Sequence, residues 1–300
     1  MTLSIAVVTM NRANQLKEAI QSCLSCNLPR ETEFVIIDNA STDNTSETVR
    51  NVMEESGYSY YYERMPENLG WGGGRNYAYS HSNGDYMYML DDDAVIDYES
   101  NPDFFLVAIK TLEANPKIHT LTTQIYDTSW ERNRLSVSNN MISDNLYEIP
   151  MFCGGSHFLS KRFFGNTEPY MANKYGYEEI PPSLLVLDAG GINAFRSDLL
   201  VIHKPMIDKW DWSQKQNQEL YLKAFAMPYA IKWIMYPSIF RPLLWLGYKM
   251  RTLKYLRETK DGSKKCDELS ILLSKTLPVN SKIKMSTVFK MWFTFGLSTF

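Results

Sequence analysis

The chain has 300 residues, of which 44% are hydrophobic, so it is long and apolar enough to build one large core with or without an appendage. Its 31 Lys and Arg residues and 34 Asp and Glu residues give a net charge of -3. This balance lacks the basic field typical of nucleic-acid-binding proteins, so it excludes nucleic acid as an expected partner. An anionic substrate must therefore be bound by a local site.

Short apolar runs alternate with helical patterns in the first half of the sequence. We predict strands at residues 4–9, 33–38, 58–63, 85–90 and 118–124. Apolar residues recur at helical spacing from Leu16 to Leu24 and again from Val49 to Met53. This alternation is typical of an α/β fold with a doubly wound, Rossmann-like, mostly parallel sheet flanked by helices.

The cysteines and the start of the chain favour a reducing, cytoplasmic location. Cys23 and Cys26 form a C-x-x-C pair inside the first predicted helix, where buried packing is favoured over a zinc or redox role. The first residues lead directly into a strand, without the charged and apolar regions of a signal peptide. No segment reaches the roughly 18 consecutive apolar residues of a membrane-spanning helix.

Unusual polar residues follow four of the predicted strands. They are Thr9-Met10-Asn11-Arg12, Asp38-Asn39-Ala40-Ser41, the segment from Asn68 to Asn76, and Asp91-Asp92-Asp93. Ligands of open α/β sheets bind beyond the carboxyl ends of the strands. We therefore expect these four segments to converge on one crevice.

Three consecutive aspartates follow the apolar strand at residues 86–90. Carboxylates so close together repel one another, and a bound cation removes that penalty. Mg²⁺ or Mn²⁺ favours hard oxygen ligands and commonly combines one or two carboxylates with substrate phosphates. The acidic run therefore predicts a divalent-cation site, and the alternative is a solvated acidic turn at a helix start.

The glycines between residues 70 and 74 precede Arg75 at the expected start of a helix. Glycine allows a backbone to approach a ligand closely, so Arg75 is a candidate contact for a phosphate or a base. A flexible turn is the alternative. The spacing lacks the last glycine of the dinucleotide-binding motif.

These four segments, in this order, resemble the motifs of family 2 glycosyltransferases over roughly the first 100 residues. The resemblance implies a GT-A fold, an inverting mechanism and a nucleotide-diphosphate-sugar donor. It implies Asp91 and Asp93 as metal ligands, Asp38 as a contact of the nucleotide base, and Thr9 and Arg12 in the nucleotide pocket. The full set of expected donor-binding residues is Thr9, Asn11, Arg12, Asp38, Asn68, Gly70, Gly74, Arg75 and Asp92.

The second half is similar to the galactofuranosyltransferase branch of the same superfamily, through residues 190–196, Lys209-Trp210-Asp211 and residues 219–224. An inverting transfer needs a carboxylate that takes the proton of the acceptor hydroxyl. Gln216 and Asn217 stand where one alignment places the family's paired acids, and neither can serve. The candidate bases are therefore Asp211 first, Glu219 second, and Glu178 or Glu179 after them.

A histidine often completes the metal site of this family, but residues 236–241 contain none. His203 lies earlier in the chain, and a lone histidine is more often a packed or surface residue than a ligand. Arg241 is an alternative contact for the diphosphate.

We expect a glycosyltransferase domain at residues 1–241, with a nucleotide-sugar-binding half at 1–125 and an acceptor-binding half at 126–241. Residues 130–182 suit substrate-facing loops. Residues 242–300 form a predicted helical appendage. Leu243, Leu246, Met250 and Leu253 recur there at helical spacing beside basic residues. Such a helix can lie on anionic lipid, pack on the catalytic domain or contact a sister subunit of a homo-oligomer.

The sequence thus predicts an inverting, Mg²⁺- or Mn²⁺-dependent hexosyltransferase. Its expected donor is a nucleotide-diphosphate sugar, most simply a UDP-sugar, and its expected acceptor is a hydroxyl of a saccharide or lipid-linked saccharide in cell-surface polysaccharide synthesis. It would work in the cytoplasm or at the inner face of the cell membrane. The alternatives are a nucleotidyltransferase and a catalytically silent nucleotide- or carbohydrate-binding protein.

Overall fold

The computed structural model describes residues 2–173, 176–205, 218–257, 259 and 261–300. Its strands are β1 (Leu3–Thr9), β2 (Thr32–Asp38), β3 (Ser59–Arg64), β4 (Tyr86–Asp91), β5 (Ala94–Ile96), β6 (Ile118–Asp127), β7 (Arg132–Asn133), β8 (Met141–Ser143), β9 (Leu146–Ile149), β10 (Ser156–Ser160) and β11 (Ile192–His203). Its helices are α1 (Ala13–Leu24), α2 (Thr45–Ser56), α3 (Gly70–His81), α4 (Phe104–Ala114), α5 (Lys161–Phe164), α6 (Ile180–Asp188), α8 (Gln218–Met235), α9 (Arg241–Tyr255), α10 (Gly262–Thr276) and α11 (Met285–Phe295), with 3-10 turns η1 (Ser238–Phe240) and η2 (Gly296–Thr299).

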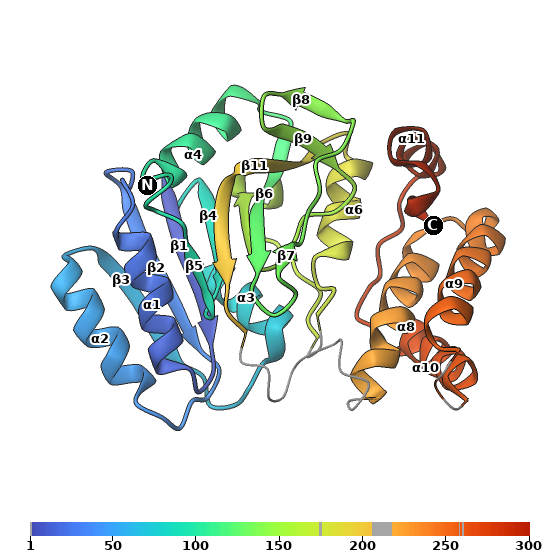
Figure 1. Ribbon diagram of the computed structural model, residues 1–300, viewed down its shortest axis with the longest axis horizontal. Helices are drawn as coiled ribbons and strands as arrows, with labels where there is room; N and C mark the ends of the chain where they lie inside the picture. The colour runs from blue at the N-terminus through green and yellow to red at the C-terminus, as the bar shows by residue number, and fades with distance from the viewer. Residues whose placement is uncertain (1, 174–175, 206–217, 258, 260) are drawn as a thin grey trace.

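One mixed sheet runs through the molecule in the order β3-β2-β1-β4-β10-β6-β11-β9-β8 (Figure 1). The strands β3, β2, β1 and β4 are parallel, as the sequence predicted. The strand β10 is antiparallel to both of its neighbours, β4 and β6, whereas β6 and β11 are parallel. The segment predicted as loops after residue 130 therefore contributes a central strand and a short β8-β9 ribbon.

Alternating side chains of the sheet fill two separate cores. On one face, residues such as Ile5 and Ile36 pack with α1, α2 and α4. On the other face, residues such as Ala6 and Val35 pack with α3, α5 and α6. Because both faces are covered, the inner strands β1, β2 and β4 are largely apolar, and Thr9, Asp38 and Asp91 stand where these strands end.

The helix α3 begins at Gly70, five residues before the start that the sequence suggested near Arg75. Its first two turns therefore contain the glycine cluster, and Arg75 lies inside the helix in a buried position. This places the Arg75 guanidinium under the carboxyl end of the sheet instead of at a helix N-terminus.

The helices α8, α9, α10 and α11 lie together on one side of the sheet (Figure 1). A third apolar cluster joins them to α6, with Leu184, Ile231 and Val288 among its members. Thr287 Oγ1 also donates a 2.6 Å hydrogen bond to Asp188 Oδ1 at the end of α6. Within the described ranges, no helix combines the length and apolar character needed to cross a bilayer.

Candidate active site

The carboxyl ends of β1, β2 and β4 lie side by side. Thr9 at the end of β1 pairs with Asp38 of β2, and Val8 pairs with Asp91 at the end of β4. The polar segments that follow these strands are therefore brought to one edge of the sheet. Thr9, Asp38, Asp92, Asp93 and Arg75 are all buried there.

Asp92 is bound to the protein itself. Its carboxylate accepts hydrogen bonds from Thr9 Oγ1 at 2.7 Å and from Arg12 Nη1 at 2.8 Å. Burial raises the pKa of Asp92 to about 6, although the nearby Arg12 charge works in the opposite direction. Thr9 and Arg12 thus attach the β1 loop to the acidic turn, and Asp92 has the role of an anchor in this turn.

Asp91, Asp93 and His203 form a group that can hold a metal ion, because one ligand atom from each lies within 4.8 Å of the others. His203 Nε2 is 3.1 Å from Asp93 Oδ1. Two carboxylates and an imidazole are a donor set that suits Mn²⁺ and also Mg²⁺. The structure thus brings the two predicted ligands together and adds a third.

The position of His203 depends on long-range strand pairing. His203 is the last residue of β11 and pairs with Ala94, which directly follows the acidic run. The sequence analysis favoured packing for His203, because nothing local links it to residues more than a hundred positions earlier. The usable signal was an apolar run, Leu199 to Ile202, that ends in a polar residue at a strand end.

Asp127 orients His203 from the other side, and the sequence analysis did not identify it. Its Oδ2 lies 3.0 Å from His203 Nδ1 and 2.7 Å from Arg134 Nη2. Although burial opposes ionisation, hydrogen bonds from Ser129 and Arg134 lower the pKa of Asp127 to about 2. An ionised Asp127 that accepts the Nδ1 proton leaves the Nε2 lone pair of His203 available to a cation.

Arg75 links the acidic run to the second half of the chain. Its Nη2 donates to Asp91 Oδ1 at 2.7 Å, and its Nη1 donates to Glu178 Oε1. The buried guanidinium thus bridges one predicted metal ligand and one of the candidate bases. The next residue, Glu179, is half-buried at the start of α6.

Glu179 has a strongly perturbed acidity. Burial is the main cause that raises the pKa of its carboxyl to about 8, and the adjacent Glu178 adds to this effect. Arg75 lowers it and Asp91 raises it, so the Glu179 carboxyl lies within the electrostatic reach of the acidic run. Two neighbouring carboxyl groups in different environments are a common arrangement for proton transfer.

Asp211 and Glu219 are the other two predicted bases. Asp211 lies outside the described residues. Glu219 is described, but its side chain is 74% exposed and pairs with Lys223 at 2.6 Å on the same helix. Among the four candidates, Glu179 is the described carboxyl with both burial and a raised pKa.

Side-chain hydrogen bonds join the loops expected to contact the nucleotide. Asn11 Oδ1 accepts the Thr42 N–H at 2.7 Å, which joins the loops after β1 and β2. Asp38 accepts hydrogen bonds from the Ser41 N–H at 2.7 Å and from Tyr62 Oη at 2.9 Å. Direct hydrogen bonds therefore hold together the loops that surround the predicted nucleotide contacts.

Asn68 forms a tight turn in the third of these loops, directly before α3. Its Oδ1 accepts the Gly70 N–H at 2.7 Å. This bond fixes the chain at the start of α3, two residues before the first close approach of the helix to another segment.

Two glycines of α3 are required by contacts within the protein. A Cβ at Gly72 would lie 1.9 Å from the Met171 carbonyl oxygen, and a Cβ at Gly74 would lie 2.7 Å from Val8 Cγ1. The sequence analysis expected the close approach to be to a ligand. The structure shows that both positions approach the protein's own chain, which by itself requires glycine there, and the approach to a ligand stays a prediction.

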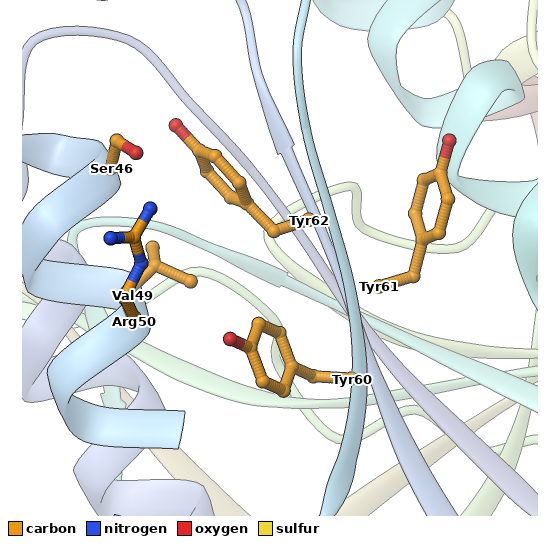
Figure 2. Close-up of a pocket in the computed structure, with 6 residues that line it drawn as sticks. All are labelled: Ser46, Val49, Arg50, Tyr60, Tyr61 and Tyr62. Atoms are coloured by element: carbon orange, nitrogen blue, oxygen red, sulfur yellow. The ribbon is translucent and has the colours of Figure 1, made fainter. Parts of the chain in front are cut away.

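A separate pocket of about 360 Å³ lies between α2 and the edge strand β3 (Figure 2). Tyr60 and Tyr62 point toward Arg50 of α2, whereas Tyr61 points to the other face of the strand. None of the predicted donor-binding or metal-binding residues lines this pocket. The Tyr62 hydroxyl, which donates to Asp38, connects this pocket with the site.

Comparison with known families decides how this site is to be understood. A family model described as glycosyl transferase family 2 matches residues 4–170, which is more than half of the chain. The chain belongs to glycosyl transferase family 2. The prediction of a glycosyltransferase is thereby confirmed at the level of the family, while the finer resemblance to its galactofuranosyltransferase branch remains an expectation.

A curated relative is similar over a short segment. It is the GalNAc(5)-diNAcBac-PP-undecaprenol beta-1,3-glucosyltransferase of Campylobacter jejuni, 29% identical over 91 residues. The alignment covers 30% of this chain and 29% of that protein. The chain thus matches less than a third of this relative.

Solved structures of two other proteins share the fold. S. aureus TarS 1-349 in complex with UDP-GlcNAc gives a TM-score of 0.66 at 13% identity, over 100% of this chain and 89% of that one. The mannosyltransferase PcManGT of Pyrobaculum calidifontis, in complex with GDP-Man and Mn2+, gives a TM-score of 0.60 at 16% identity. This match covers 99% of this chain and 85% of that one. The predicted GT-A fold with a C-terminal helical region is confirmed.

Proposed function

We propose that this family 2 glycosyltransferase transfers a sugar from a nucleotide-diphosphate sugar to an acceptor hydroxyl, with inversion and with the help of a divalent cation. The observation that carries the proposal is the convergence of Asp91, Asp93 and His203 at the carboxyl edge of the sheet. The Arg75 guanidinium bonds to both Asp91 and Glu178, and Glu179, whose carboxyl is weakly acidic, directly follows Glu178.

Asp91, Asp93 and His203 would hold Mn²⁺ or Mg²⁺. A bound cation offsets the charge that develops on the diphosphate leaving group as the glycosidic bond breaks. Asp127 holds the His203 ring with Nε2 directed toward Asp93. Arg12 neutralises part of the acidic turn through bonds to Asp92 and Asp93, so the three aspartates coexist without full repulsion.

We assign Glu179 as the general base among the described carboxyl groups. In its ionised form, Glu179 accepts the proton of the acceptor hydroxyl as the hydroxyl oxygen attacks the anomeric carbon. A base whose pKa lies near the working pH accepts a proton more readily than an ordinary carboxylate. One displacement at the anomeric carbon inverts its configuration and needs no covalent enzyme intermediate. Asp211 remains the candidate from the sequence.

The donor and acceptor classes are supported by similar proteins. The structure of TarS contains UDP-GlcNAc, and that of PcManGT contains GDP-Man and Mn2+. The name of the Campylobacter jejuni relative specifies an undecaprenol-linked saccharide. We therefore propose a UDP-sugar donor and a saccharide or lipid-linked saccharide acceptor, in cell-surface polysaccharide synthesis at the inner face of the membrane.

A screen of UDP-, GDP- and dTDP-sugars tests this proposal. We expect one donor class to be hydrolysed slowly in the presence of Mn²⁺, and hydrolysis to stop when the metal is chelated. Asp93→Asn should reduce the rate by about two orders of magnitude or more, because a metal ligand that stabilises developing charge is lost. The matched variant Asp144→Asn, in the exposed turn between β8 and β9, should retain the wild-type rate.

Two outcomes would contradict the proposal. If Asp93→Asn is folded and as active and as metal-dependent as wild type, the cation assignment is wrong. If a donor binds without any turnover, with or without simple saccharide acceptors, the chain is a nucleotide- or carbohydrate-binding protein.

A further inference from the structure

The charges of the chain are divided between two regions of opposite sign. Residues 1–241 contain 20 Lys and Arg and 30 Asp and Glu residues, a net charge of -10. Residues 242–300 contain 11 Lys and Arg and 4 Asp and Glu residues, which gives a net charge of +7. The overall charge of -3 conceals this separation. The C-terminal helices therefore carry a positive field of their own.

The helix α9 presents an apolar stripe on its outer face. Leu244, Tyr248 and Thr252 are buried at a spacing of four residues, so this face of α9 packs on the protein. The opposite face carries Leu243, Leu246, Met250 and Leu253, and the last two are each 64% exposed. A run of four large apolar side chains in water is costly, and such patches mark interaction surfaces.

Basic residues flank this stripe. On a helical wheel, Lys254 lies on one side of the stripe, and Lys249, which is paired with Asp267 of α10, lies on the other. Long basic side chains beside an apolar stripe can reach past it toward anionic groups. An amphipathic helix with this pattern is suited to lie in the plane of a membrane surface.

The helix α11 extends the same surface. Phe240, the last residue of η1 and directly before α9, and Phe289 of α11 have ring centroids 5.3 Å apart, so α11 meets the chain at the start of α9. Next to this contact, Ile239 is 67% exposed and Phe293 of α11 is 84% exposed. Lys290 lies between Phe289 and Phe293 in the sequence and is exposed.

The charge distribution indicates what kind of partner binds this surface. A two-fold dimer through α9 would bring two regions of charge +7 together, because the same patch is used on both copies. The chain's own catalytic region does not cover the stripe, since its residues are exposed in the folded chain. A negatively charged lipid surface complements both the apolar stripe and its cations.

We propose that the outer face of α9, with the exposed end of α11, binds anionic phospholipid bilayers. The chain would lie on such a bilayer with Leu246, Met250 and Leu253 inserted at the boundary between head groups and acyl chains. This surface shares no residue with the Asp91–Asp93–His203 group. The proposal therefore does not depend on the sugar transferred or on the identity of the base.

Co-sedimentation of the full chain with lipid vesicles tests the proposal. We expect binding to vesicles that mix phosphatidylglycerol with phosphatidylcholine, weak binding to phosphatidylcholine alone, and a decrease with salt. The double variant Met250→Asp and Leu253→Asp should bind about tenfold more weakly or worse, because two apolar contacts become charged. Its control is Val137→Asp, which alters a side chain 62% exposed outside the helical group.

A charge series separates the electrostatic contribution. Lys254→Glu and Lys290→Glu should each weaken binding about fivefold or more, since a Lys near an anionic surface contributes about 1 kcal/mol. Lys110→Glu, an equal charge change on α4, should have little effect. Thermal unfolding and donor hydrolysis should remain at wild-type levels in all of these variants, which separates a lipid-binding defect from a failure of the proposed function.

Three results would overturn the proposal. The first is equal binding to neutral and anionic vesicles. The second is wild-type binding by the Met250→Asp and Leu253→Asp double variant. The third is a wild-type dimer in solution that this double variant dissociates, without any vesicle binding, which would assign the stripe to a second copy of the chain.

Discussion

The adjacent residues Glu178 and Glu179 occupy different electrostatic environments at the start of α6. Glu178 accepts a hydrogen bond from the buried Arg75, whereas the Glu179 carboxyl has a pKa of about 8 because of burial and the neighbouring Glu178. Arg75 thus bonds directly to one carboxyl, while the neighbouring Glu179 carboxyl retains its proton to higher pH. This asymmetry produces a measurable effect on stability even without substrate.

The stability of the metal-free protein should depend on pH through Glu179. An ordinary glutamate has a pKa of 4.5, so between 4.5 and about 8 the unfolded chain has released a proton that folded Glu179 retains. Its contribution is complete below pH 4.5 and is lost as the pH rises toward 8. Glu179→Gln, which remains neutral, should show a smaller loss of unfolding free energy across this range, measured by urea denaturation in the presence of a chelator.

The exposed Glu168 provides the control for this experiment. Glu168→Gln should leave the pH dependence of the wild type unchanged. If Glu179→Gln and wild type lose the same stability over this range, Glu179 does not hold its proton in the folded state, and its assignment as a base with raised pKa fails.

The helix α3 needs glycine where another segment of the chain packs closely against it. Gly72 faces the backbone of residues 171 and 173 at distances that leave no room for a side chain. Gly73, the next residue, has only Leu69 Cβ near its own ideal Cβ position, at 3.1 Å. The two glycines therefore offer a matched pair on one helix.

Gly72→Ala should destabilise the protein by about 1–3 kcal/mol, because the added methyl group overlaps the Met171 carbonyl oxygen and the two segments must separate. Gly73→Ala should be neutral or stabilising by up to about 1 kcal/mol, since alanine favours a helix over glycine. Chemical denaturation of both variants measures the difference. Equal stability of the two variants would show that α3 does not need the close approach at Gly72.

Features defined by neighbouring residues could be predicted from the sequence, whereas features defined by contacts between distant residues could not. The strand β1 and the Asp91–Asp93 run were predictable, because an apolar run and its polar end are local properties of the sequence. His203 and Asp127 were not, since only the pairing of β11 with β5 and β6 brings them to the acidic run. The glycines of α3 were recognised as sites of close approach, but their partners, Met171 for Gly72 and Val8 for Gly74, lie far away in the sequence.

At the scale of the whole molecule, the candidate metal site joins distant parts of the chain. Asp91 and Asp93 come from the first hundred residues, whereas His203 ends the last strand of the sheet. A cation bound to all three would connect the β4–β5 turn with β11. Such a cation binds the folded chain and not the unfolded one, so it must stabilise the fold.

We therefore expect Mn²⁺ to raise the thermal unfolding midpoint of the wild-type chain. At a concentration a hundred times the dissociation constant, binding contributes about 2.7 kcal/mol. For a chain of this size, that corresponds to an increase of about 5 °C. His203→Ala removes one of three ligands and weakens binding about tenfold or more, so about half or less of the increase should remain at the same Mn²⁺ concentration. His81→Ala, which removes a histidine from α3, should retain the full increase. If His203→Ala and wild type respond equally to Mn²⁺, the cation is held by the carboxylates alone, and β11 does not contribute to the site.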